Sequence, residues 1–171
     1  MEKVSYPDGT PVKKGDIIWV NEGLHVRKVV RILTNEDDLE SEDMDEPSIF
    51  WARYIGPLDM GSLGFHGISH FVEDGVSKLS QTELLCIKML YTQLGRQIQE
   101  QIWEKDYFYY PILHPQEIGH HTYKWVWYLF FQKFQEKIDS FDHEKCFRFD
   151  EERMMFEPVT QKEQNLVRGF M

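Results

Sequence analysis

Residues 7–33 read PDGTPVKKGDIIWVNEGLHVRKVVRIL, and this stretch decides how the chain begins to fold. Asp8-Gly9 and Gly15-Asp16 are turn signals that flank short β segments. Asn21-Glu22-Gly23 reverses the chain between two runs rich in β-branched residues. The stretch therefore predicts the opening of a small antiparallel barrel or curled sheet.

Four strands are expected in this half of the chain. Ile17–Val20 should pair with Leu24–Leu33, whose imperfect alternation of apolar and polar residues indicates a bulge near Lys28-Val29. Further strands are expected over Ser48–Ile55 and Ile68–Val72. Short strands at close spacing with Gly-rich turns favour an SH3-like barrel over a parallel sheet.

The period of the apolar residues then changes from two to three or four. Ser80-Gln81-Thr82-Glu83 fits a capping box, and the pattern after it predicts a helix over about residues 81–105. Aromatic residues at helical spacing predict a second helix from roughly residue 120 to 141. One or two short strands are expected near the end, over 147–149 and 154–159 around a turn at Asp150-Glu151-Glu152, followed by a short helix.

The expected fold class is thus α+β: a small antiparallel curled sheet or SH3-like barrel with two long packed helices and short C-terminal strands. We expect a single domain over residues 1–171, with a β-barrel-like part at 7–76 and a helical part at 80–171 that includes the C-terminal strands. With 171 residues, 42% of them apolar, the chain can bury one sizeable core.

Composition also bounds the compartment and the partners. Cys86 and Cys146 have no metal-like spacing, which suits free thiols in a reducing compartment. No window approaches the roughly 18–20 apolar residues of a membrane span, so we expect a cytoplasmic protein without membrane contact. A net charge of -10 disfavours binding to nucleic acid, because phosphates repel an acidic surface.

Much of the negative charge lies in residues 36–46, which we call the acidic segment. Eight of its residues are acidic, and no Lys or Arg occurs from Ile32 to Ala52. The acidic residues are Glu36, Asp37, Asp38, Glu40, Glu42, Asp43, Asp45 and Glu46. A calcium loop of the EF-hand type needs a central Gly, which this segment lacks.

Two interpretations of the acidic segment remain. It is either a solvated loop or a surface that attracts a basic protein partner. The second predicts a partner-binding site with Trp51 and Phe65 as apolar anchors. Its expected acidic members are Glu36, Asp37, Asp38, Glu40, Asp43, Asp45 and Glu46.

Signatures of catalysis are missing from the sequence. It contains no Gly-x-Ser-x-Gly, phosphate loop or dinucleotide fingerprint. His66 and His70 have the i, i+4 spacing of zinc ligands, but glycine interrupts the segment and the Glu of a zinc protease motif is missing. We expect no catalytic residue, no metal and no cofactor. An enzyme built on His66, His70 and distant carboxylates stays an alternative, as does an adaptor or regulatory module that binds a peptide or small ligand.

The runs Asp8-Gly9-Thr10-Pro11-Val12-x-x-Gly15-Asp16 and Phe71-Val72-Glu73-Asp74-Gly75-Val76-x-x-Leu79-Ser80-x-x-Glu83 carry a resemblance. The chain resembles small acidic bacterial proteins with a β-barrel-like front half, some of which are similar to immunity proteins of bacterial toxin delivery systems. The resemblance implies a non-enzymatic protein that neutralises a basic toxin or effector by occluding its active site. It transfers no site residue, and it leaves the oligomeric state open.

Overall fold

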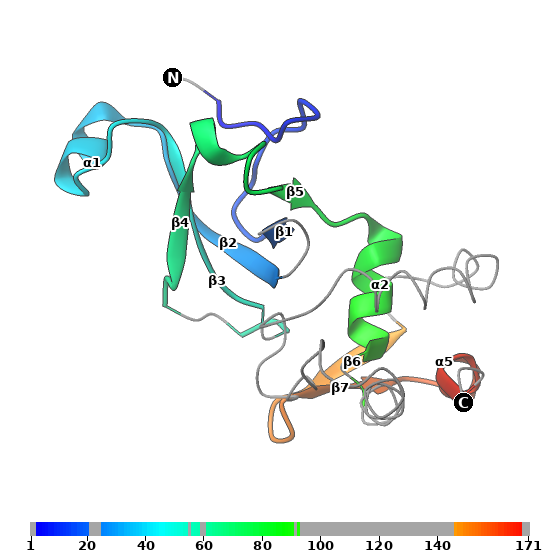
Figure 1. Ribbon diagram of the computed structural model, residues 1–171. Helices are drawn as coiled ribbons and strands as arrows, with labels where there is room; N and C mark the ends of the chain where they lie inside the picture. The colour runs from blue at the N-terminus through cyan, green and yellow to red at the C-terminus, as the bar shows by residue number, and fades with distance from the viewer. Residues whose placement is uncertain are drawn as a thin grey trace, which may run out of the picture.

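The computed structural model in Figure 1 describes residues 3–20, 25–54, 56–58, 61–90, 92 and 146–168. Five of its strands form one antiparallel sheet in the order β4-β3-β2-β1-β5, and two more form a separate hairpin, β6-β7. The strands are β1 (Ile17–Val20), β2 (His25–Leu33), β3 (Ser48–Arg53), β4 (Gly64–Gly67), β5 (Ser77–Lys78), β6 (Phe147–Asp150) and β7 (Met155–Pro158). The helices are α1 (Glu36–Ser41), the 3-10 helix η1 (Ile68–His70), α2 (Gln81–Leu90) and α5 (Gln161–Arg168).

The first three strands pair as their sequences predict. β1 pairs with β2, and β2 pairs with β3, both antiparallel. The register between β2 and β3 shifts between Val29 and Arg31, which confirms the bulge expected in this strand. The bulge changes the face to which the following side chains point, and it thereby places Arg31 opposite Phe50.

The predicted fold class is wrong, because the sheet is open. β4 and β5 are its two edges and do not pair with each other, so no barrel closes. Closure fails physically because β5 has only two residues and because the chain leaves β4 into η1. The strand expected over Ile68–Val72 is therefore also wrong, and the β4 strand lies just before it.

Two long packed helices do not occur in the described part of the chain either. α2 has ten residues, whereas a helix over about 81–105 was expected, and the longest other helix described, α5, has eight. Residues 93–105 and the helix expected at 120–141 lie outside the described residues. The C-terminal strands were predicted correctly, since β6 and β7 form the expected hairpin.

An N-terminal segment covers one face of the sheet and forms the core with it. Val4, Tyr6 and Val12 pack with Ile18, Val20, Val29, Ile49, Phe71 and Val76. The Tyr6 hydroxyl donates to the buried carboxylate of Asp16 at 2.7 Å, and Lys78 of β5 pairs with the same carboxylate at 3.3 Å. Burial raises the pKa of Tyr6, and the hydrogen bond to Asp16 adds to the rise. The hydroxyl therefore stays protonated and fixes the segment to the sheet.

α2 begins at the capping box that the sequence predicts. The Glu83 amide donates to Ser80 Oγ at 3.1 Å, and the Ser80 amide donates to Glu83 Oε1 at 3.2 Å. The other oxygen of Glu83 accepts from the indole N–H of Trp19, which is buried in β1. One carboxylate thus caps the helix and also attaches it to the sheet.

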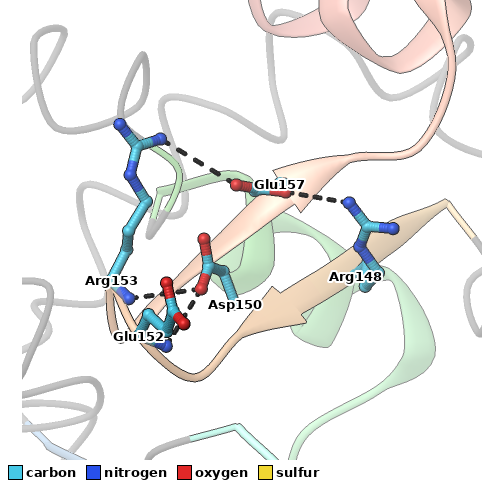
Figure 2. Close-up of polar contacts among 5 residues, drawn as sticks. All are labelled: Arg148, Asp150, Glu152, Arg153 and Glu157. Atoms are coloured by element: carbon cyan, nitrogen blue, oxygen red, sulfur yellow. Dashed lines mark hydrogen bonds and ion pairs between the residues drawn. The ribbon is translucent and has the colours of Figure 1, made fainter.

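The C-terminal hairpin closes through a charged turn (Figure 2). Asp150 accepts hydrogen bonds from the backbone N–H groups of Glu152 and Arg153, and these bonds lower the pKa of its carboxyl group. Glu157 lies between Arg148, at 3.1 Å, and Arg153, at 3.9 Å. A structural role follows for the residues whose charged groups are engaged within the hairpin: Arg148, Asp150, Arg153 and Glu157.

Candidate partner-binding surface

The acidic segment begins with a short helix, α1, rather than the loop that a run of like charges suggests. Asn35 is its N-cap, and the side chain of Asn35 accepts from the Asp37 amide at 2.9 Å. Glu36, Asp37 and Asp38 occupy the first turn, where the helix dipole favours negative charge. Helix formation therefore fixes the spacing of these carboxylates.

The C-terminal end of α1 is closed by a Schellman motif. The Met44 amide donates to the Leu39 carbonyl at 2.8 Å, and the Asp43 amide donates to the Glu40 carbonyl at 3.1 Å. Asp43 has φ 55, the left-handed conformation that glycine usually adopts at this position. No basic residue lies in the last turn, so Glu40 and Asp43 face the unfavourable end of the helix dipole.

Two of the eight acidic side chains hold the segment to the sheet. Glu42 pairs with Arg31 of β2 at 2.7 Å. Glu46 accepts from the backbone N–H of Ser69 at 3.1 Å and from its hydroxyl at 2.5 Å. Glu46 also packs so closely on Gly67 that a Cβ there would lie 2.1 Å from its Oε1. The C-terminal half of the acidic segment is thus anchored, to β2 through Glu42 and to η1 through Glu46.

The six remaining acidic residues are exposed: Glu36, Asp37, Asp38, Glu40, Asp43 and Asp45. α1 protrudes from the margin of the sheet (Figure 1, light blue). A shallow hollow of about 290 Å³ lies in the segment, lined by Glu36, Glu40, Asp43 and Asp45 around Leu39 and Met44. The hollow is thus lined by four carboxylates and two apolar side chains, which suits the charged head and aliphatic stem of Lys or Arg.

An aromatic ladder crosses the sheet beside this segment. Arg31, Phe50 and Phe65 lie directly opposite one another on β2, β3 and β4, so their side chains share one face. The Arg31 guanidinium lies 5.8 Å from the centre of the Phe50 ring, and the two phenyl rings are 5.7 Å apart. Phe65 is 57% exposed. Through Arg31 the ladder joins the ion pair that anchors Glu42.

Trp51 does not join Phe65, although both were expected to be apolar anchors. Trp51 is opposite Gly64, so it lies on the other face of the sheet and packs against the core. Its indole N–H donates to Nδ1 of His66 at 2.8 Å. The Arg27 guanidinium lies 5.0 Å from the centre of its ring. The structure thus brings Phe65, but not Trp51, to the side of the sheet where a partner could reach it.

His66 bonds to Trp51 and Asp74 and does not form a zinc-like pair with His70. Its Nδ1 accepts from Trp51, and its Nε2 lies 2.9 Å from Asp74. Burial lowers the pKa of His66 and outweighs the opposing effect of the Asp74 carboxylate. His70 is exposed and lies 3.7 Å from Glu73. Among the described residues, no group of three or more His, Cys, Asp or Glu side chains is arranged to hold a metal.

Reasoning from sequence missed Arg31 and Phe50, which share a face of the sheet with Phe65, and the exposed apolar side chains of Leu63 and Ile68 beside β4. Leu63 and Ile68 are 51% and 39% exposed at the two ends of β4. Their apolar character was visible in the sequence, but their exposure follows from the position of β4 at the edge of the sheet. Nothing local in the sequence signals an edge strand.

Comparisons with protein-family models, with curated proteins and with solved structures found no match. Within the ranges that the structure describes, no helix is long and apolar enough to cross a membrane.

Proposed function

We propose that the protein is a non-enzymatic binding protein that neutralises a basic protein. The proposed mode of action is that of an immunity protein: the acidic segment covers the cationic substrate cleft of a toxin or effector and occludes its active site. Glu36, Asp37, Asp38, Glu40, Asp43 and Asp45 would pair with Lys and Arg of the partner. Phe65 would supply the desolvated contact next to them.

This proposal rests on the observation that the acidic segment has a defined folded structure. Like charges repel one another, so a dense acidic run is ordinarily extended and solvated. Here an N-cap, a Schellman motif and two anchoring carboxylates hold the run as a helix at the margin of the sheet. Asp43 keeps a left-handed conformation that glycine would adopt with less strain. These features fit a surface on which charge is retained in a fixed geometry for binding.

We retain Phe65 as an anchor but omit Trp51 and Glu46 from the proposed contact. Trp51 faces the core, and the carboxylate of Glu46 is bonded to Ser69. A preorganised acidic surface accelerates association with a basic partner by electrostatic steering, so the on-rate should fall as salt is added.

A charge-neutralised variant tests the proposal. Glu40→Gln, Asp43→Asn and Asp45→Asn together remove three carboxylates at the C-terminal side of α1, where negative charge does not favour the helix. The variant should therefore fold as well as the wild type. A matched control, Glu73→Gln with Glu151→Gln and Glu152→Gln, makes the same change of net charge at other exposed positions.

The assay is capture of proteins from an extract of the source cells, followed by mass spectrometry and by binding kinetics with the captured protein. The proposal expects a basic protein that binds the wild type and the control, with loss of binding in the charge-neutralised variant. It also expects inhibition of the activity of that protein. Equal capture by all three chains, or capture of acidic proteins only, would contradict it.

A further inference from the structure

The two edges of the five-stranded sheet differ in their protection. Sheet edges are commonly protected by short strands, lysine or proline, because an open edge can pair with another chain. β5 has two residues and carries Lys78, which pairs with Asp16. β4 has four residues, Gly64–Gly67, and contains neither lysine nor proline. Of these two edges, as far as the described residues show, the β4 edge therefore lacks the lysine and proline that usually protect an edge.

The backbone of Phe65 faces the open side of β4. The Ile68 amide donates to the Pro47 carbonyl at 3.0 Å, which fixes the phase of the pairing with β3. Residues of an antiparallel strand alternate between facing the partner strand and facing away from it. Counting back from Ile68, His66 faces β3 and Phe65 faces away. No strand of the described chain pairs with that side, and the Phe65 amide and carbonyl can accept a new strand there.

The side chains along this edge supply apolar area to such a strand. Phe65 and Leu63 are both more than half exposed. The ladder from Arg31 through Phe50 to Phe65 would continue into a side chain of the added strand, directly opposite Phe65. The Leu63 amide already donates to the Trp51 carbonyl of β3, and at the other end of β4 the Glu46 carboxylate lies on Gly67. We therefore centre the new pairing on Phe65.

The negative charge of the neighbouring acidic segment determines which kind of chain can add a strand to β4. Glu46 attaches the end of this segment to Ser69 of η1, the short helix that follows β4. A strand added to β4 would therefore run beside exposed carboxylates. We infer that β4 accepts an extended segment of a basic partner as an added strand, with an apolar side chain opposite Phe65 and with Lys or Arg directed to the acidic segment. The inference rests on the proposed function for the partner and names how that partner is bound.

Synthetic peptides test the inference without the natural partner. The probe is a labelled peptide with Arg, Val and Arg at every second position and Thr between them, here called the Arg-Val peptide, so that the Val and Arg side chains share one face. The controls are the same peptide with Glu in place of Arg, and the Arg-Val peptide with methylated backbone nitrogens. Binding is measured by fluorescence anisotropy, and exchange of the Phe65 amide by NMR. We expect both controls to bind at least about tenfold more weakly, as expected for lost hydrogen bonds or charge pairs. We also expect the Arg-Val peptide to slow exchange at Phe65.

Each other result overturns strand addition: no binding of the Arg-Val peptide, equal binding of the methylated peptide, or unchanged exchange at Phe65 with the peptide bound. Capture of a basic protein that depends on the acidic segment, together with any of these results, leaves the proposed function standing. Protection of Phe65 by the peptide in a chain that captures no basic protein supports strand addition and counts against the proposed function.

Two substitutions at one position separate the ring from the backbone. Phe65→Ala removes the ring and keeps the N–H, whereas Phe65→Pro removes both. Because this N–H faces away from β3, the proline breaks no bond within the sheet, and edge strands tolerate proline. Phe65→Pro should bind the Arg-Val peptide several-fold more weakly than Phe65→Ala. Equal affinities would overturn the inference. Thermal unfolding shows whether Phe65→Pro is folded. If it is not folded, hydrogen exchange of the Phe65 amide in the wild type, with and without the Arg-Val peptide, tests strand addition instead.

Discussion

Glu83→Ala should destabilise the protein more than an ordinary helix-cap mutation. Glu83 accepts from the buried Trp19 indole and from the Ser80 amide, so the substitution removes two hydrogen bonds at once. Loss of the acceptor for a buried N–H costs about 1–3 kcal/mol. Loss of the capping arm adds about 0.5–1 kcal/mol. The free energy of unfolding should therefore fall by about 1.5–4 kcal/mol in total.

Urea unfolding, followed by tryptophan fluorescence and by circular dichroism, measures this change. Ser80→Ala is the matched control, because it breaks only the other arm of the capping box and should cost about 1 kcal/mol. Glu83→Gln keeps an acceptor oxygen and should fall between the two variants. If Glu83→Ala costs no more than Ser80→Ala, the bond to Trp19 does not stabilise the docking of α2 on the sheet.

Three further predictions concern His66, Asp43 of the acidic segment, and Gly56, on which the C-terminal hairpin packs. Burial lowers the pKa of His66 below its value in the unfolded chain, so its contribution to stability is fully present above about pH 6.5 and is lost as the pH falls below that value. Below that pH the unfolding free energy of His66→Gln should fall less steeply than that of the wild type. Parallel curves of unfolding free energy against pH would refute this. Asp43→Gly should raise the unfolding free energy by about 0.5–1 kcal/mol, because glycine adopts the left-handed conformation without strain, and a loss in thermal unfolding would count against that reason. Gly56→Ala should lower the free energy of unfolding in urea by about 1–3 kcal/mol, since the new Cβ would lie 2.5 Å from the Phe149 ring and φ of Gly56 is +52. Unchanged stability would mean that the C-terminal hairpin does not pack closely on Gly56, just after β3.

The elements that were predicted correctly depend on near neighbours in the chain. β1 follows from a run of apolar residues and β2 from an imperfect alternation, with a turn signal between them, and β6 and β7 likewise flank a turn signal. The capping box before α2 needs only two residues three positions apart. Such patterns are readable because side chains that lie a few residues apart meet whatever the rest of the fold does.

The errors concern partners that are distant in the sequence. Ile68–Val72 has the composition of a strand, yet Glu46, more than twenty residues away, bonds to Ser69 and the segment forms η1 with a following turn. α1 was missed for another reason: Asn35 is an ordinary N-cap signal, but the charge of the acidic segment favoured a solvated loop. Closure of a barrel depends on the lengths of the edge strands β4 and β5, which the pattern of apolar residues in the sequence does not specify.

The sequence by itself determined that the negative charge is concentrated in residues 36–46, because charge is a property of composition. The tertiary structure decided which of these carboxylates are engaged, through Arg31 and Ser69, and which are exposed. It also decided that Phe65 faces outward and that Trp51 faces the core. Successive residues of a strand point to opposite faces, so a register set by pairing with a distant strand assigns each side chain to the surface or to the interior.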